Sequence, residues 1–159
     1  MSEKIVLDPC CGSRMFWFDK KDPRAVFGDN RELEDVLCDG RNLSITPDIK
    51  LDFRSLPFNS GHFALVVFDP PHLIYAGESS WVAKKYGVLA KTWKDDIRAG
   101  FSECFRVLRD DGVLIFKWNE TQIKVSELLA LTPNKPLFGH RSGKASNTHW
   151  ITFMKPKSK

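Results

Sequence analysis

Residues 62–72 read HFALVVFDPPH, and this stretch decides the fold class of the 159-residue chain. Six of its first seven residues are apolar. A strand that is apolar at consecutive positions, rather than at alternate ones, is typical of a sheet covered on both faces. Proline removes a donor from the hydrogen-bond ladder, so Pro70-Pro71 ends the strand just after Asp69. The stretch therefore predicts a central parallel strand whose carboxyl end carries an acidic residue.

Other apolar runs predict the neighbouring elements. Further strands are expected at residues 4–7, 24–27, 49–53 and 113–118. Helices are expected at residues 13–20, 31–38, 93–108 and 126–131. The runs at 137–139 and 149–154 predict an antiparallel hairpin at the sheet edge. Strands that alternate with helices predict an α/β fold with a mostly parallel sheet and helices on both faces.

The composition is typical of one globular domain. The chain is 42% hydrophobic and 28% charged, with a net charge of +4. We expect a single minimal domain over residues 1–159, with a core at about 4–154 and a basic tail at 155–159. No apolar run approaches the roughly 20 residues of a membrane-spanning helix, and the N-terminus lacks the apolar stretch of a signal peptide. These features predict a cytoplasmic protein without a membrane partner.

The four cysteines predict neither a disulfide framework nor a metal site. Cys10, Cys11, Cys38 and Cys104 form no C-x-x-C pair. Their spacing does not match that of zinc ligands. We therefore expect reduced thiols and no bound metal.

Acidic residues gather where the predicted strands end. Asp8, Asp29 and Asp69 follow strands directly, and Asp52 lies within the third strand candidate. Ligands of open α/β sheets bind at the carboxyl ends of the strands. Aspartate is also common in turns and helix caps, so this clustering alone leaves both interpretations open.

The loop after the first strand reads Asp8-Pro9-Cys10-Cys11-Gly12-Ser13. A glycine in such a turn lets the backbone approach a ligand closely. Asp29, at the end of the second strand, is suited to accept hydrogen bonds from a ribose diol. The G-x-G-x-x-G pattern of dinucleotide-binding loops is absent, which disfavours a nicotinamide cofactor. Asp8 would repel phosphate and suits the ammonium group of an amino acid.

These residues resemble a known family. The 8–13 loop is similar to the D-P-x-C-G-S loop of class I S-adenosylmethionine-dependent methyltransferases, whose sheet is Rossmann-like. Asp69-Pro70-Pro71-His72 (DPPH) resembles the [D/N]-P-P-aromatic motif of their amino-methylating branch, which includes adenine and cytosine N-methyltransferases of DNA and RNA. Residues 52–58, DFRSLPF, resemble the family's D-x-x-x-L-P-F stretch. The resemblance covers the chain from Ile5 to about Met154.

The resemblance implies a site for S-adenosyl-L-methionine. The 8–13 loop would hold its methionine part, Asp29 its ribose, and Asp52 with Phe53 its adenine. Cofactor-binding residues are accordingly expected at Asp8, Pro9, Cys10, Cys11, Gly12, Ser13, Asp29, Asp52, Phe53 and Asp69. Arg14 stands where the family often has a second glycine. It is expected to reach the cofactor carboxylate or a substrate phosphate, or to be an ordinary surface residue.

The D-P-P-H motif implies the catalytic residues Asp69, Pro70, Pro71 and His72. An exocyclic amine is a poor nucleophile because its lone pair is delocalised into the ring. The Asp69 side chain and the Pro70 carbonyl would accept its two N–H hydrogens and so localise the lone pair, while Pro71 helps to fix the backbone. His72 stands where most relatives have Tyr, Phe or Trp, and would stack on the base.

Aromatic and basic residues downstream predict a substrate surface. Residues 74–94 interleave aromatic rings with lysines, which suits a loop that closes over a nucleic-acid strand. An amphipathic helix that covers the core explains the same pattern. Substrate-binding residues are expected at Tyr75, Trp81, Lys84, Lys85, Tyr86, Lys117 and Asn119.

Together these features predict an N-methyltransferase acting on an exocyclic amine of a nucleobase in DNA or RNA. The alternatives are methylation of a protein side-chain amide or a small molecule, and a non-catalytic module that binds cofactor or nucleic acid. The chain has no room for a separate target-recognition segment. We therefore expect a minimal catalytic core that acts on accessible bases, forms a homodimer, or borrows recognition from a partner.

Overall fold

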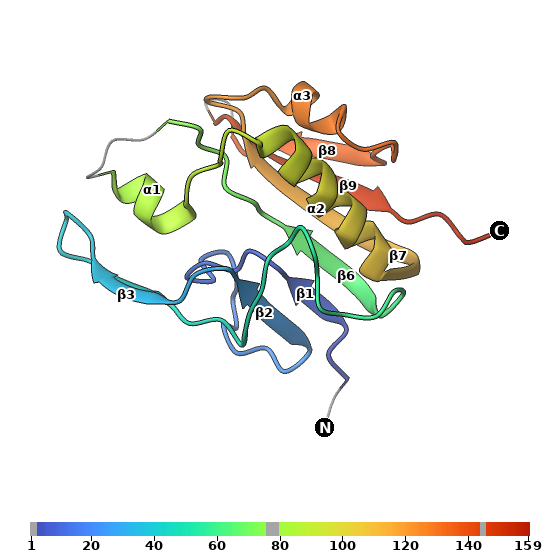
Figure 1. Cartoon of the computed structure of the whole chain (residues 1–159), viewed down its shortest axis with the longest axis horizontal. Helices are drawn as coiled ribbons and strands as arrows, with labels where there is room; N and C mark the ends of the chain where they lie inside the picture. The colour runs from blue at the N-terminus through green and yellow to red at the C-terminus, as the bar shows by residue number, and fades with distance from the viewer. Residues whose placement is uncertain (1–2, 76–79, 144–145) are drawn as a thin grey trace.

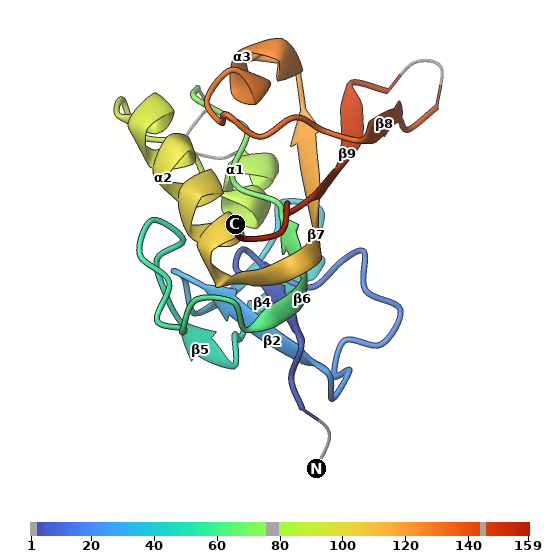
Figure 2. The same cartoon turned by 90° about the vertical axis from the view of Figure 1, so that its right-hand side faces the viewer.

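A seven-stranded sheet forms the centre of the protein in the computed structural model, which describes residues 3–75, 80–143 and 146–159. The strand order is β5-β2-β1-β6-β7-β9-β8; Figure 1 labels these strands from β2 to β8, and Figure 2 labels β5. The strands are β1 (Val6–Asp8), β2 (Ala25–Asp29), β5 (Ile49–Lys50), β6 (Phe63–Phe68), β7 (Leu108–Asn119), β8 (Phe138–Arg141) and β9 (Thr148–Met154). The pairings from β5 to β7 are parallel, whereas β9 pairs antiparallel with β7 and with β8. The mostly parallel sheet and its antiparallel C-terminal hairpin are confirmed.

The predicted central strand, β6, lies between β1 and β7. Its register places Val66 beside Leu114 and Phe68 beside Phe116, and all four side chains are fully buried. The consecutive apolar run in the sequence therefore reflects a strand with neighbours on both edges and little exposure on either face.

One long helix covers this part of the sheet. The helices are α1 (Trp81–Tyr86), α2 (Trp93–Val107) and α3 (Val125–Leu129). On α2, Ile97, Phe101 and Phe105 recur at intervals of four residues and join the main core with Phe116. The rings of Phe101 and Phe116 lie 4.9 Å apart between centroids. Burial of this apolar stripe holds α2 against β6 and β7, as the sequence predicts.

Two expected helices are not helical in the structure. Residues 13–20 form turns, and the helix expected at 31–38 is wrong: β3 (Leu33–Val36) pairs antiparallel with β4 (Asn42–Ile45). The Asp39-Gly40 dipeptide is a hairpin turn signal, and Gly40 has a φ of 83°. Leu37, Leu43 and Ile45 form a small separate core, and their burial stabilises the hairpin.

The absence of those two helices changes the layering. Within the described residues, α2 and α3 contribute to the same core, on one side of the sheet (Figure 2). On the other side the 9–24 loop packs Trp17 against Phe27, with ring centroids 4.7 Å apart. Leu65 and Ile115 lie on this second side and are only partly buried. The sheet is thus covered by helices on one face and partly by a loop on the other, where helices on both faces were expected.

The helix expected at 93–108 and the strand expected at 113–118 leave residues 109–112 between them, but the structure has no loop there. The helix ends at Val107 and β7 begins at Leu108, so Asp110-Asp111-Gly112 lies inside the strand. Asp111 has a φ of 60°, and the β6–β7 register shifts between Phe63 and Leu65. This irregularity lets the chain turn from helix to strand without a loop. No helix among the described residues is long and apolar enough to cross a membrane.

Candidate active site

The main cavity opens at the carboxyl ends of β1, β2 and β6, where the sequence predicts a ligand site. It encloses about 60 Å³ and opens to solvent at its mouth. Its lining comprises Pro9, Cys10, Cys11, Gly12, Ser13, Met15, Phe16, Asp29, Asn30, Arg31, Leu51, Phe53, Asp69, Pro71, Lys85 and Lys117. The structure therefore brings most of the predicted cofactor residues together around one space.

The loop after β1 is held in place by the end of β2. The Cys11 amide donates to the Gly28 carbonyl at 2.8 Å, and the Gly12 amide donates to Asp29 Oδ2 at 2.9 Å. Gly12 has a φ of 50°, a conformation that favours glycine. The loop backbone thus follows the wall of the cavity, so that no large side chain intervenes between Gly12 and a ligand.

Asp8 lies beneath this loop and does not line the cavity. Its side chain is fully buried and accepts hydrogen bonds from Trp17 Nε1 at 2.8 Å and from the Cys10 amide at 3.3 Å. Burial raises the pKa of Asp8 from 3.8 to about 7, against the opposing effect of the Trp17 hydrogen bond. Asp8 therefore supports the loop from below. Trp17 had not been predicted as part of the site.

Asp29 is buried at the end of β2 and is bound by Arg31 as well as by Gly12. The backbone amide and Nε of Arg31 donate to Asp29 Oδ1 at 2.9 and 3.2 Å. The other end of the guanidinium donates to the carbonyl oxygens of Lys84 and Lys85 at 3.0 and 3.3 Å. Arg31 thereby ties the acidic strand end to the last turn of α1. It is a site residue that the sequence analysis missed.

The segment that follows β5 contributes apolar walls to the cavity in place of the expected acid. Leu51 and Phe53 line the cavity, and the Phe53 ring packs edge-on against Phe68 at 5.3 Å. The Asp52 carboxylate points elsewhere: Arg54 donates to both of its oxygens, and the closest contact is 2.6 Å. The structure therefore leaves Asp52 outside the cavity.

Asp69 ends β6 at the cavity wall, with Pro70 buried behind it and Pro71 beside it in the lining. Its Oδ2 lies 3.4 Å from Lys117 Nζ. Burial raises the pKa of Asp69 from 3.8 to about 6, and the Lys117 ammonium limits the rise through its charge and its hydrogen bond. Asp69 is thus a shielded acid whose charge state depends on one lysine.

Aromatic rings surround Lys117. Its ammonium lies 5.3 Å from the ring centroid of Phe16 and 5.5 Å from that of Trp150. The Phe16 and Trp150 rings pack edge-on at 5.5 Å. Phe16 lines the cavity. Neither ring was predicted as a site residue, because each comes close to Asp69 only through the fold.

His72 packs edge-on against Trp118, with ring centroids 6.2 Å apart, and does not line the cavity. Burial, together with the smaller effect of the nearby Lys117 charge, lowers the pKa of His72 from 6.5 to about 4. The imidazole is therefore neutral at physiological pH.

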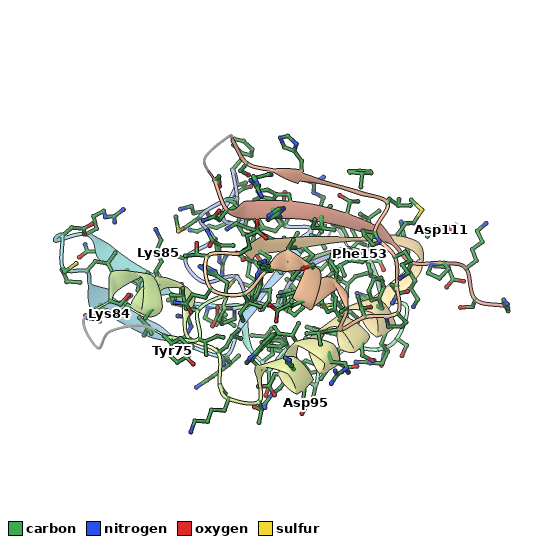
Figure 3. All side chains as sticks on the ribbon, turned by 90° about the horizontal axis from the view of Figure 1, so that it is seen from above. Tyr75, Lys84, Lys85, Asp95, Asp111 and Phe153 are labelled. Carbon is green, nitrogen blue, oxygen red and sulfur yellow. The ribbon has the colours of Figure 1, made fainter. Side chains whose placement is uncertain are left out.

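The residues expected to bind substrate are dispersed. Lys85 and Lys117 line the cavity, whereas Lys84 pairs with Asp35 at 3.1 Å. Tyr75 is 79% exposed; Figure 3 shows it on the side of α1 with Lys84 and Lys85, away from Asp111 at the opposite end. Asn119 is bonded to Thr121 and Thr148. The side chains of Trp81 and Tyr86 lie outside the described residues.

Arg14, for which three roles were expected, faces away from the main cavity. Its guanidinium lies 3.9 Å from the Phe27 ring centroid and donates to the Thr46 carbonyl at 2.9 Å. Among the described residues, no group of three or more His, Cys, Asp or Glu side chains could hold a metal ion. All four cysteines are free thiols in the structure.

Comparisons with known proteins identify the fold. No protein-family model matches the chain, and a search of curated proteins finds no match. A solved structure from Pyrococcus horikoshii aligns over 96% of this chain and 81% of its own, with a TM-score of 0.60 and 16% identity. A SAM-dependent methyltransferase of Methanosarcina mazei aligns over 96% and 92%, with a TM-score of 0.55 and 12% identity. Another from Leishmania major aligns over 94% and 63%, with a TM-score of 0.56 and 11% identity. The chain therefore has the class I SAM-dependent methyltransferase fold.

Proposed function

We propose that this chain is an S-adenosyl-L-methionine-dependent N-methyltransferase that acts on the exocyclic amine of a nucleobase in DNA or RNA. One observation carries the proposal: the shielded carboxylate of Asp69 and the 9–13 loop with Asp29 face the same cavity. The Asp69 carboxylate suits an amine that must lose a proton. The 9–13 loop and Asp29 suit an adenosyl amino acid.

The residues present fit the cofactor. Asp29 offers carboxylate oxygens to a ribose diol, Gly12 and Ser13 offer close backbone approach to the amino-acid part, and Leu51 and Phe53 offer an apolar wall to the adenine. Bound there, S-adenosyl-L-methionine would supply an electrophilic methyl group on a sulfonium. Asp69 then has to hold the acceptor amine next to that position, which is catalysis by orientation.

Asp69 suits this task because it is an ionised acceptor in a shielded place. With its pKa at about 6, the carboxyl is mostly ionised at pH 7. A carboxylate accepts N–H hydrogen bonds strongly where water is excluded. In the proposed reaction, Asp69 and the Pro70 carbonyl bind the two amine hydrogens. Lys117 keeps Asp69 ionised.

A planar, ring-bearing substrate is favoured by the side chains around Asp69. Phe16 in the cavity wall and Trp150 packed against it supply flat apolar surfaces around the Lys117 ammonium, which lies beside Asp69. Lys85 adds a cationic group at the cavity wall. Flat rings stack on unpaired bases, and cations suit a phosphate backbone.

The test is transfer of a labelled methyl group from S-adenosyl-L-methionine to single-stranded DNA, duplex DNA, RNA, and a protein extract. We expect label in one nucleic-acid pool, lost in Asp69→Ala and retained in the control Asp95→Ala, whose side chain is 82% exposed. Calorimetry should show that Asp69→Ala still binds the cofactor. Label in protein alone would replace the nucleobase with a side-chain amide. Cofactor binding without transfer to any pool would contradict the proposed enzyme.

A further inference from the structure

A second cleft lies beside the 12–14 backbone. Its volume is about 410 Å³, and it opens between the 13–21 loop and the end of β4. It is lined by Gly12, Ser13, Arg14, Lys20, Lys21, Ser44, Thr46 and Asp48. Gly12 and Ser13 also line the main cavity, so both spaces border the same short piece of chain.

Arg14 fixes the two walls of this cleft. Its guanidinium donates to the carbonyl oxygens of Lys20 and Thr46, and so joins the loop to the strand end. It also packs over the ring of Phe27, and only 14% of its side chain is exposed. Arg14 has a φ of 58°, which is uncommon for a residue with a side chain. An anchored arginine therefore ties the loop to the strand end in the lining of this cleft.

The charge of the cleft is positive. Arg14 lies 3.4 Å from Asp48 Oδ1, and the Phe27 amide donates to Asp48 Oδ2 at 3.1 Å, so the one acid in the lining is compensated. The side-chain amines of Lys20 and Lys21 make no hydrogen bond or ion pair within the described part of the chain. The hydroxyl groups of Ser13, Ser44 and Thr46 add neutral donors. Two uncompensated ammonium groups beside hydroxyl donors suit an anion with several acceptor oxygens.

We infer that this second cleft binds a phosphate group, with Lys20 and Lys21 as its cationic ligands. The phosphate has two possible sources, the backbone of a nucleic-acid strand or a free phosphorylated small molecule. The first source rests on the proposed function, because a strand whose base reaches Asp69 must place its backbone nearby. The phosphate site itself does not depend on methyl transfer.

The test compares Lys20→Gln/Lys21→Gln with Lys124→Gln/Lys135→Gln, a control pair that removes the same charge from exposed positions near α3. The probes are inorganic phosphate, a 5′-phosphorylated mononucleotide, and a 12-nucleotide single strand with and without a 5′-phosphate. Calorimetry measures the first two, and fluorescence anisotropy at 50–300 mM salt measures the strands. Cofactor binding by each variant is measured alongside.

We expect the Lys20/Lys21 variant to bind at least one probe ten-fold or more weakly, with the control pair within two-fold of the unaltered protein. For the strand, loss of two phosphate contacts should reduce the slope of log Kd against log salt by about 1.4. Weaker binding of the strand alone identifies a backbone site, whereas weaker binding of the small phosphates identifies a free ligand. Equal losses in both variants, or no binding of any probe, would overturn the inference. These binding measurements do not depend on methyl transfer, so failure of the phosphate site and failure of the proposed function can be told apart.

Discussion

Replacing Lys117 with methionine should make Asp69 harder to ionise and shift the activity of the site toward higher pH. Methionine keeps the length of the side chain and its contact with the Phe16 ring, but it removes the ammonium 3.4 Å from Asp69 Oδ2. Both effects that oppose the burial-driven rise in the pKa of Asp69 come from Lys117. Removing this lysine therefore removes the local stabilisation of the carboxylate.

The magnitude follows from the hydrogen bond that is lost. A hydrogen bond to a charged group contributes about 1.5–3 kcal/mol, and about 1.4 kcal/mol corresponds to a ten-fold change in a protonation equilibrium. Asp69 should thus become about ten- to a hundred-fold harder to ionise. With the pKa of Asp69 at about 6, the carboxyl is ionised in roughly nine molecules of ten at pH 7. In Lys117→Met, that fraction should fall to between about a half and a tenth.

The assay is the pH dependence of methyl transfer between pH 5 and 9, with Lys117→Arg as the charge-conserving control. We expect the acidic limb of the profile to move up by about one to two pH units in Lys117→Met and to stay near its original position in Lys117→Arg. Carbon-13 resonances of labelled aspartate carboxyls, assigned with Asp69→Asn, follow the same titration without any substrate. An unchanged Asp69 titration in Lys117→Met would refute the reasoning.

Three further changes test the rest of the site. Asp29→Ala should weaken cofactor binding by about 1–3 kcal/mol in calorimetry, since it removes a charged acceptor; unaltered affinity would exclude Asp29 from the binding site. Arg31→Ala should speed proteolytic cleavage within α1 while leaving the thermal midpoint of unfolding nearly unchanged, because it removes the link between Asp29 and the end of that helix. Arg31→Lys should restore protection from the protease only in part, because lysine cannot reach both Asp29 and the two carbonyl groups. In the folded state the pKa of Asp8 is about 7, above the ordinary value of 3.8, so the folded chain binds more protons between these values and the free energy of unfolding falls as pH rises from about 4 to 7. Asp8→Asn should flatten that fall in urea titrations, and an equally steep fall would contradict it.

The parts of the fold that sequence reasoning predicted are those with a strong local signal. β6 is apolar at consecutive positions, and α2 repeats its buried residues every four positions, so each element can be recognised without its neighbours. The 31–38 segment was misread because its apolar residues also fit helical spacing. Its conformation is set by the Asp39-Gly40 turn and by pairing with a strand that begins at Asn42.

The site divides in the same way. The acids at the strand ends were found because the carboxyl ends of parallel strands meet at one edge of the sheet. Trp17 and Arg31 were not predicted as site residues. The contact of Trp17 with Asp8 depends on how the 9–24 loop folds back onto the sheet, and the contact of Arg31 with Lys84 depends on where α1 packs. Asp52 shows the converse: a motif position can be right while the side chain is drawn to a neighbour, here Arg54.

The partners of the buried acids explain why our proposal gives the catalytic role to Asp69 and not to Asp8. Asp8 and Asp69 end adjacent strands, and the charges of Asp69 and Asp29 both disfavour ionisation of Asp8. The hydrogen-bond donors to Asp8 are an indole and an amide, which carry no charge. With a pKa of about 7, Asp8 is therefore protonated part of the time at pH 7, which reduces its repulsion with Asp69 and Asp29. Asp69 has an ammonium partner and faces the cavity, so it retains its charge where a substrate can reach it. Different environments thus separate two chemically identical side chains: Asp8 supports the loop, and Asp69 is the one available for the proposed role of amine acceptor.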